Sequence, residues 1–476
     1  MRRASPSVPL PSSKRAQSLL HTGQCIVNQA KWLAAATPGA TPGVAARALS
    51  LRANFSWTFA GNIIYSAAQW AMLVVLAKLG SKEMVGLFTL GLAVTAPVMM
   101  LTNLQLRGIQ ATDARHEYLF GHYLGLRLLT TLLALTVIAG IVIISAPGWG
   151  PGLVILAVGV AKAFESVSDV IYGLLQQHER MDRIATSMMI KGPLSLAALA
   201  IGVYLTHSVL WATLGLALTW ALVLAGYDIR SAIVVLRVSQ KAGADWSRAL
   251  RPIGDPRPLI ALAWLALPAG IVMAMLSLSV NTPRLFVARY LGTNDLAIFA
   301  SMAYVLVAGA TLTTALGQAA APRLSQYFAA GNVPAFRALL TKLLGIGAVL
   351  GGAGVLMGLV AGRTILTLLY RPDYAGHVDA FVWLLVAAGL EYIASFLGYA
   401  LTAARYLRIQ VPIFAAVIAF MLVAGPFIIP AHGMVGAAWV FGASFVLQIP
   451  LEGSVIVYAL RKRARQYTGQ IGQDNV

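Results

Sequence analysis

The chain alternates between long apolar segments and short polar or glycine- and proline-containing connections. A transmembrane helix needs about 20 predominantly apolar residues, and most of these segments are at least that long. They therefore predict twelve membrane-spanning helices. The predicted spans cover residues 55–78, 84–106, 121–145, 152–176, 183–205, 208–234, 259–288, 295–320, 336–361, 377–402, 408–429 and 433–459.

Composition supports an all-α polytopic membrane protein. Apolar residues make up 59% of the chain and charged residues only 11%, whereas a soluble domain has about 25% charged residues. This excludes a soluble globular protein. Long apolar runs also argue against an outer-membrane barrel, whose strands alternate apolar and polar residues over short segments.

Basic residues are distributed unequally between the two sides of the predicted spans. Of the 35 lysines and arginines, 26 lie in the two tails and the even-numbered connections or at the span ends beside them, five lie in or beside the odd-numbered connections, and four lie deeper within spans. Cytoplasmic connections carry the excess of lysine and arginine in membrane proteins. The bias predicts a multi-pass protein of the cell inner (cytoplasmic) membrane with both termini in the cytoplasm.

Other features exclude several kinds of chemistry. The net charge of +19 is explained by the orientation signals, so no nucleic-acid partner is expected. The single cysteine, Cys25, cannot form an intramolecular disulfide. No metal-binding cluster, phosphate-binding loop or catalytic constellation is recognisable, so we expect no metal site, no cofactor and no enzyme activity.

Two pairs of similar segments indicate an internal duplication. AKLGSKEMVGLF (77–88) is similar to ARYLGTNDLAIF (288–299), and residues 163–180 align with residues 389–406, which places Glu165 opposite Glu391. The duplication predicts two lobes of six helices, with the substrate between them. The expected division is a basic flexible tail (1–53), an N-lobe (54–237), a cytoplasmic linker (238–257), a C-lobe (258–461) and a cytoplasmic tail (462–476). For the first tail, a transit peptide is the alternative interpretation.

Two segments resemble a known family. NFSWTFAGNIIYSAAQWAMLVVLAKLGSKEMVGLFTLGLAV (54–94) and FESVSDVIYGLLQQHERMDRIATSMMIKG (164–192) are similar to the polysaccharide exporter, O-antigen flippase-like branch of the multidrug/oligosaccharidyl-lipid/polysaccharide (MOP) flippase superfamily. The resemblance implies a MATE-like fold and alternating access. It also implies movement of undecaprenyl-diphosphate-linked oligosaccharide across the membrane for O-antigen, capsule or exopolysaccharide synthesis. The resemblance suggests three further partners, which are membrane lipid, a polysaccharide polymerase and a chain-length regulator.

The fourth predicted span carries an unusual group of charged residues. Lys162, Glu165, Asp169 and Tyr172 follow one another at helical spacing and share one face of the helix. Charged residues within membrane spans are costly and usually face a cavity or a partner. We expect a polar cavity wall in which Lys162 binds phosphate. The alternative is a Lys162–Glu165 pair that only orders the bundle, with Asp169 unpaired in either case.

Three other cations lie within predicted spans: Arg127, Lys191 and Arg284. Together with Lys162 they are the candidate cavity cations, because a diphosphate offers several anionic oxygens to such groups. For Arg127 and Lys191 the alternative is that the side chain extends to the membrane interface.

The acids Glu165, Asp169 and Glu391 are the candidates for coupling transport to an ion gradient. Glu391 has an alternative role as a protonated acid that is hydrogen-bonded within the bundle. Glu452, near the last cytoplasmic end, is expected to extend to the interface.

Three other functions are consistent with a chain of this kind. A proton- or sodium-coupled multidrug extruder resembles a pattern with an acid in the first helix, and residues 54–82 contain none. A lipid II-type flippase often has more than twelve spans. A polytopic polysaccharide polymerase or ligase needs a substantial outer loop, and the outer connections here are short.

Overall fold

The computed structural model describes residues 51–113, 117–145, 148–239 and 250–474, and no strand occurs in these ranges. The first half contains α2 (Leu51–Leu79), α3 (Lys82–Asn103), α4 (Leu106–Thr112), α5 (Phe120–Ser145), α6 (Trp149–Gln177), α7 (Met181–Thr206), α8 (Val209–Val223), the π-helical turn η1 (Leu224–Asp228) and α9 (Ile229–Ser239). The second half contains α11 (Pro256–Tyr290), α12 (Thr293–Val305), α13 (Val307–Ala329), α14 (Val333–Leu369), the 3-10 turn η2 (Pro372–His377), α15 (Val378–Ala403) and α16 (Leu407–Asp474). We call these two sets the N-terminal and the C-terminal bundle.

Each of the twelve predicted spans coincides with a helix, or with helices that follow one another directly. By length and composition, nine helical segments in the described ranges can cross a membrane, and α12 with α13, bent by 41°, makes a tenth. The α16 segment is counted once, although Gly433 breaks it into two helices at a left-handed φ of 61°. The charge-bearing α6 is not in that count, but its 29 residues are long enough to span a bilayer. The prediction of an all-α polytopic membrane protein is confirmed.

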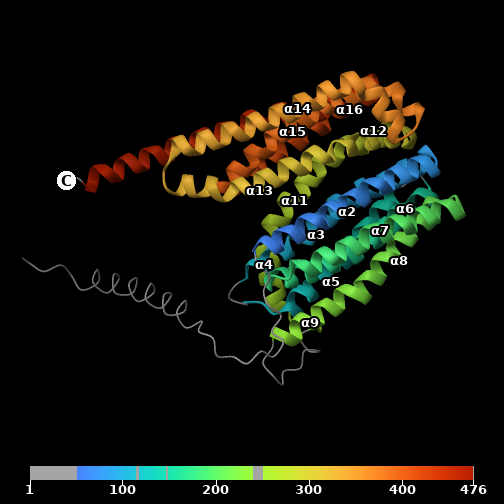
Figure 1. Cartoon of the computed structure of the whole chain (residues 1–476), viewed down its shortest axis with the longest axis horizontal. Helices are drawn as coiled ribbons and strands as arrows, with labels where there is room; N and C mark the ends of the chain where they lie inside the picture. The colour runs from blue at the N-terminus through green and yellow to red at the C-terminus, as the bar shows by residue number, and fades with distance from the viewer. Residues whose placement is uncertain (1–50, 114–116, 146–147, 240–249, 475–476) are drawn as a thin grey trace, which may run out of the picture. The chain divides into compact units, whose positions relative to one another are not determined.

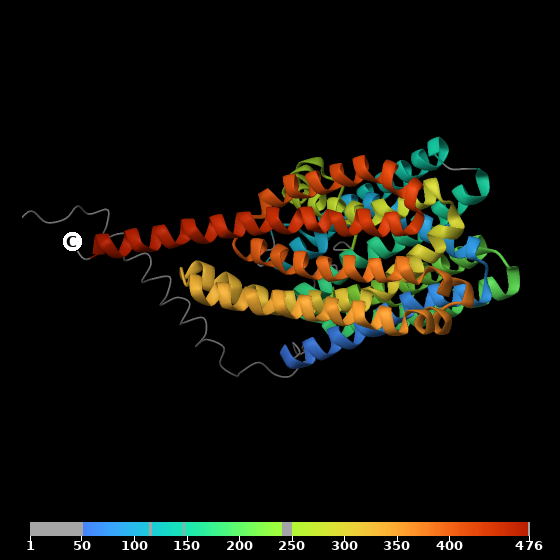
Figure 2. The same ribbon diagram turned by 90° about the horizontal axis from the view of Figure 1, so that it is seen from above.

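Helices that are distant in the chain pack together as extensively as helices that follow one another (Figure 1). In the N-terminal bundle α2 packs along α7, α7 along α8, and α6 against α3, α5 and α8. In the C-terminal bundle α15 packs between α14 and α16, and α13 also contacts α15. The two bundles meet where α11 and α12 pack against α3. Beyond the neighbouring helices, the end of α16 continues as a single long helix (Figure 2).

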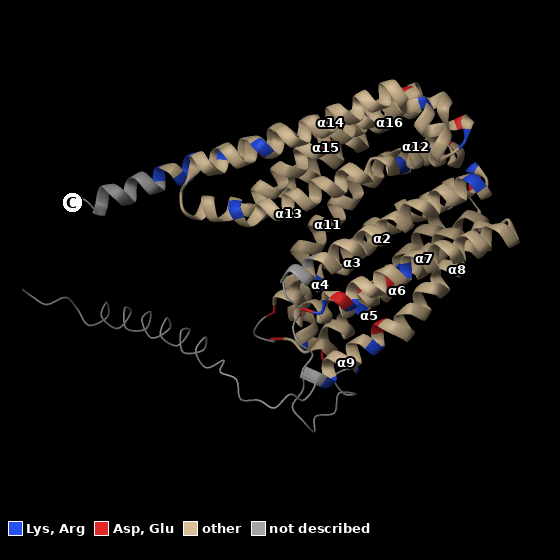
Figure 3. Ribbon diagram, in the orientation of Figure 1, with Lys and Arg blue, Asp and Glu red and all other residues tan. Residues whose placement is uncertain are grey.

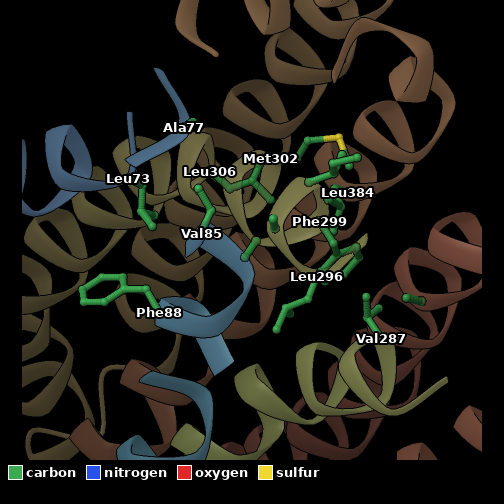
Figure 4. Close-up of a cluster of buried hydrophobic side chains, with 14 of the residues drawn as sticks. Leu73, Ala77, Val85, Phe88, Val287, Leu296, Phe299, Met302, Leu306 and Leu384 are labelled. Atoms are coloured by element: carbon green, nitrogen blue, oxygen red, sulfur yellow. The ribbon is translucent and has the colours of Figure 1, made fainter. Parts of the chain in front are cut away.

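One large cluster of buried apolar side chains includes residues from both bundles (Figure 4). Leu73 and Phe88 come from the first bundle, and Phe299 and Leu384 come from the second. Apolar burial alone drives little association in lipid, so helices there depend on close packing, which small residues permit. Gly86 illustrates this, because a methyl group at its position would overlap the backbone of Thr293. The two similar segments, 77–88 and 288–299, are therefore in direct contact.

Polar contacts also join the bundles at one end, and we call them the outer contact because the sequence predicts that this end faces away from the cytoplasm. The guanidinium of Arg371 donates to the carbonyl oxygens of Lys78 (3.1 Å) and Gly80 (2.8 Å) at the end of α2. Lys78 donates in return to the carbonyl of Leu368 at the end of α14 (3.0 Å). A cation at the carboxyl end of a helix satisfies its free carbonyls and interacts favourably with its dipole. Each bundle thus caps a helix of the other.

Several predicted segments extend outside the described residues. Most of the basic tail (1–53) lies outside them, as do residues 240–249 of the predicted linker and the last two residues of the C-terminal tail.

Candidate functional site

A cavity of ≈ 360 Å³ lies among α2, α3, α4, α6 and α7, with Met273 of α11 closing part of its wall. We call it the N-terminal cavity. Its polar lining consists of Tyr65, Asn103, Gln105, Arg107, Lys162, Glu165, Ser166, Asp169, Tyr172 and Lys191. Figure 3 shows charged positions along α6 well away from the ends of that helix. All four residues of the polar face expected on α6 are in this list.

Lys162 and Glu165 form an ion pair one helical turn apart, at 2.7 Å between Nζ and Oε2. The other carboxylate oxygen, Oε1, accepts a hydrogen bond from the hydroxyl of Tyr65 on α2 (2.6 Å). The ammonium of Lys162 also lies 5.1 Å from the ring centroid of Trp220. Since 28% of the Lys162 side chain is exposed, this cation is accessible from the cavity.

The expectation that Asp169 is unpaired is wrong. Its Oδ2 lies 3.3 Å from Arg127 and its Oδ1 lies 3.6 Å from Arg107. Arg127 is fully buried and also donates to Asn103, so it does not extend to the membrane interface. Burial of a cation in a membrane protein requires an anionic partner, and Asp169 provides one. Arg127 holds α3, α5 and α6 together from behind the cavity wall, since it is not among the lining residues.

Lys191 is also buried, with 2% of its side chain exposed, and its Nζ lies 3.3 Å from Asp228. The interface alternative for Lys191 is therefore wrong too. Asp228 is fully buried and accepts hydrogen bonds from Ser168 (2.7 Å) and Ser187. Asp228 is not among the site residues predicted from the sequence, although it is the only acid in the sixth predicted span. It closes the π-helical turn η1, and such turns are frequent at functional sites.

Arg107 lies just after the second predicted span, in a predicted connection, whereas the structure places it in the cavity wall. The chain turns sharply at Leu104 and Gln105, both of which adopt a left-handed conformation (φ 50° and 51°). Residues without glycine's freedom adopt this conformation at a cost of order 1 kcal/mol or more each. The turn directs α4 back against α6, where Arg107 donates to Gln176 (3.1 Å). Sequence periodicity gives no signal for such a turn.

Arg284 and Glu391 lie in the other bundle and do not line the N-terminal cavity. Arg284 donates to Asn281 (3.3 Å) and lies 5.5 Å from the ring centroid of Tyr304. Together with Glu391 it lines a small cavity of ≈ 80 Å³. The four cations expected in one cavity are thus divided: Lys162 and Lys191 line the first, Arg127 is buried behind it, and Arg284 lies apart.

Glu391 also lines a larger cavity in the C-terminal bundle, of ≈ 580 Å³. Glu452 lines the same cavity and is 1% exposed, so the expectation that it extends to the interface is wrong. Within the described ranges, no three histidine, cysteine or acidic side chains are grouped in a way that suits a metal ion.

The N-terminal cavity is therefore lined by three cations and two acids. Lys191 is buried against Asp228, whereas Lys162 and Arg107 are partly exposed, at 28% and 34%. These two are the groups that can exchange a carboxylate partner for an incoming anion. Hydrogen bonds between cations and phosphate oxygens are about twice as strong as neutral ones, which favours an anionic ligand here.

Comparisons with known proteins agree with the fold and the sequence resemblance. A family model described as "Polysaccharide biosynthesis protein" matches residues 51–328. The chain is 26% identical over 387 residues to the capsular polysaccharide biosynthesis protein CapF of Staphylococcus aureus. The aligned residues cover 81% of this chain and 94% of that protein.

Solved structures show the same fold at low sequence identity. An inward-facing multidrug resistance MATE family transporter of the MOP superfamily matches with a TM-score of 0.63 and 14% identity, covering 85% of this chain and 99% of that one. A MOP superfamily transporter from Pyrococcus furiosus matches with a TM-score of 0.58 and 14% identity, covering 85% and 95%. The chain belongs to the polysaccharide biosynthesis protein family, and it has the fold of these transporters.

Proposed function

We propose that this protein moves undecaprenyl-diphosphate-linked oligosaccharide from the inner to the outer leaflet of the cytoplasmic membrane. The observation that carries the proposal is the pair of partly exposed cations, Lys162 and Arg107, in a cavity enclosed by membrane-spanning helices. A diphosphate that leaves water needs compensating cations, and a cavity of this kind supplies them at a fixed position. The family's role in polysaccharide synthesis supports the same class of substrate.

The carboxylates Glu165 and Asp169 prepare the cavity for an anion. Each of them neutralises a cation, which lowers the cost of keeping that cation in the membrane. A phosphate that binds Lys162 and Arg107 competes with these carboxylates. Protonation of a displaced carboxyl group then links binding to proton uptake. We therefore keep Glu165 and Asp169 as coupling candidates. Glu391 is a third candidate, in the other bundle.

Coupling of transport to protons is testable in vesicles with an imposed pH gradient. The gradient should change the transport rate of the unmodified protein, and Glu165→Gln should reduce that response. An equal response in both proteins would remove Glu165 from the coupling step.

Alternating access between the two bundles is the second part of the proposal. Under the predicted orientation, the outer contact lies on the side away from the cytoplasm, because Lys78 and Lys82 follow the first span. Lys82 and Asp373 add an ion pair there, at 3.0 Å. The N-terminal cavity is lined by the parts of α3 and α6 that lead toward the predicted cytoplasmic end. In this proposal the outer contact closes the side away from the cytoplasm, and the N-terminal cavity lies toward the cytoplasmic side. This arrangement corresponds to a state that can accept substrate from the cytoplasmic leaflet.

In this proposal the N-lobe (54–237) and the C-lobe (258–461) move against each other around the contact of α3 with α11 and α12. Both termini lie in the cytoplasm, and a polymerase with a chain-length regulator takes over the product outside. The drive is an ion gradient, the membrane potential or consumption of the product.

A deletion strain tests the proposed function. We expect complete lipid-linked repeat units to accumulate in the cytoplasmic leaflet, and re-expression of the gene to clear them. Mass spectrometry of the accumulated lipid identifies the glycan. Complete units that reach the outer leaflet but are not joined would indicate a polymerase or ligase instead. Accumulation of lipid II rather than a repeat unit would indicate a lipid II-type flippase.

The multidrug extruder is the second candidate, since transporters of that class share the fold. It predicts that the deletion strain becomes sensitive to cationic drugs without accumulating lipid-linked glycan. The N-terminal cavity argues against it, because both of its acids are already paired with cations, Glu165 with Lys162 and Asp169 with Arg107.

A further inference from the structure

The larger cavity in the C-terminal bundle differs from the N-terminal cavity in its charge. It measures ≈ 580 Å³ and is enclosed by α11, α13, α15 and both halves of α16. Its polar lining is mostly neutral, with three glutamines (Gln318, Gln410 and Gln448) and several hydroxyl groups, together with the two acids Glu391 and Glu452. Neither lysine nor arginine lines it in the part of the chain that the structure describes.

One buried carboxyl group at this cavity, that of Glu452, has an oxygen atom without a hydrogen-bond partner among the described residues. Glu452 accepts a hydrogen bond from Gln448 through Oε1 (2.9 Å), whereas its buried Oε2 has no partner among the described residues. Gly398 lies beside this carboxyl group, where a methyl group in place of its hydrogen would lie 3.9 Å from Oε1 of Glu452. A buried polar atom without a partner costs about 1–3 kcal/mol, which a hydroxyl donor from a ligand would recover.

The side chains that line this cavity suit a sugar better than a diphosphate. A diphosphate would meet Glu391 and Glu452 in this wall, and no lysine or arginine among the described lining residues to compensate its charge. Amides and hydroxyls both donate and accept hydrogen bonds, as the hydroxyl groups of a sugar require. The aromatic rings of Tyr399, Phe414 and Phe445 provide apolar surface in the same wall. A mostly apolar cavity with a few well-placed polar groups is the usual form of a small-molecule site.

The two cavities share a wall, because Met273 of α11 lines both of them. A single ligand with an anionic end and a polyhydroxylated end can therefore contact both. We propose that the C-terminal cavity, through Glu452 and Gln410, binds the sugar part of the substrate while the N-terminal cavity binds its diphosphate. This assignment rests on the proposed function and adds a separate recognition site for the glycan.

Binding of two lipids to the purified protein in nanodiscs tests the assignment. One probe is undecaprenyl diphosphate that carries the oligosaccharide isolated from the producing strain, and the other is undecaprenyl diphosphate without sugar. We expect Glu452→Gln and Gln410→Leu to weaken binding of the glycan-bearing lipid about tenfold, because each removes a hydrogen bond to a buried polar group. Binding of the sugar-free lipid should not change. Lys162→Gln should weaken binding of both.

The matched control is Gln326→Leu, which makes the same change at an exposed residue of α13 outside the cavity. It should affect neither lipid. Glu452→Gln keeps the shape of the side chain and an acceptor for Gln448, so it should leave the melting temperature unchanged. With the unmodified protein, the free oligosaccharide should compete with the glycan-bearing lipid.

Three results would overturn the assignment while the proposed function stands. They are equal affinity of the unmodified protein for both lipids, equal weakening of both by the C-terminal cavity variants, and unchanged binding of both by those variants. A fourth result would also overturn it. If the protein binds tetraphenylphosphonium, and Glu452→Gln abolishes that binding but leaves lipid binding unchanged, the C-terminal cavity is a site for cations. If the unmodified protein binds neither diphosphate lipid, the proposed function itself fails.

Discussion

A covalent link between residues 82 and 373 will stop transport. In the structure Lys82 and Asp373 form an ion pair across the outer contact, and both side chains are accessible to reagents. The alternating access that we propose requires this contact to separate, so joining the two positions should hold the protein in the proposed state that is closed outside. The experiment replaces both residues by cysteine, removes the single native Cys25, and adds a bismaleimide to protein in vesicles. Transport should fall to the level of protein-free vesicles.

Two controls separate the link from the substitutions. Each single-cysteine variant treated with the same reagent should keep its transport rate, because an exposed ion pair contributes only about 0–1 kcal/mol. Replacing Asp373 by alanine should likewise have little effect. Full transport by the linked protein would show that the outer contact does not open during the cycle.

The variant Lys162→Gln will reduce transport about 10–100-fold at low substrate concentration, because it removes a charge-assisted hydrogen bond to phosphate worth about 1.5–3 kcal/mol. The alternative is that Lys162 only neutralises Glu165. A double variant distinguishes the two. If the pair is structural, Lys162→Gln with Glu165→Gln should regain transport, since no uncompensated charge is left. We expect no recovery.

The Lys191–Asp228 pair provides the matched control within the same bundle. Because both groups are buried, Asp228→Asn alone should destabilise the protein by about 3–5 kcal/mol by leaving Lys191 without its anion. Adding Lys191→Gln should recover much of the melting temperature and of the transport rate. Recovery by both double variants would assign Lys162 to structure, which contradicts the proposed role in binding.

The helices could be predicted from the sequence because membrane helices must be apolar over a fixed length. The face of α6 with Lys162, Glu165 and Asp169 could also be predicted, since helical spacing alone places these residues together. Helix breaks inside membrane segments were not predictable in this way. The left-handed turn at Leu104 and Gln105 has no glycine or proline to indicate it.

The ion-pair partners that come from other helices could not be predicted from the sequence. Arg127 and Lys191 looked able to reach the membrane interface, but Asp169 and Asp228 neutralise them in the interior. Each partner comes from a different helix, and one sequence does not give the distances between helices. Asp228 itself can be recognised in the sequence, because it is the only acid in the sixth predicted span. The sequence left both a cavity role and an interface role open for these cations, and the structure makes both of them members of buried ion pairs.

The most direct test of the central claim is transport by the purified protein in vesicles that contain undecaprenyl-diphosphate-linked oligosaccharide. External periodate oxidises only sugar that is exposed on the outside of the vesicle. In protein-free vesicles it should consume the outer leaflet's share of the glycan and then stop. With the protein present, we expect it to consume the whole pool as lipid moves between leaflets. Oxidation that stops at the outer leaflet's share, with correctly folded protein in the membrane, would contradict the account.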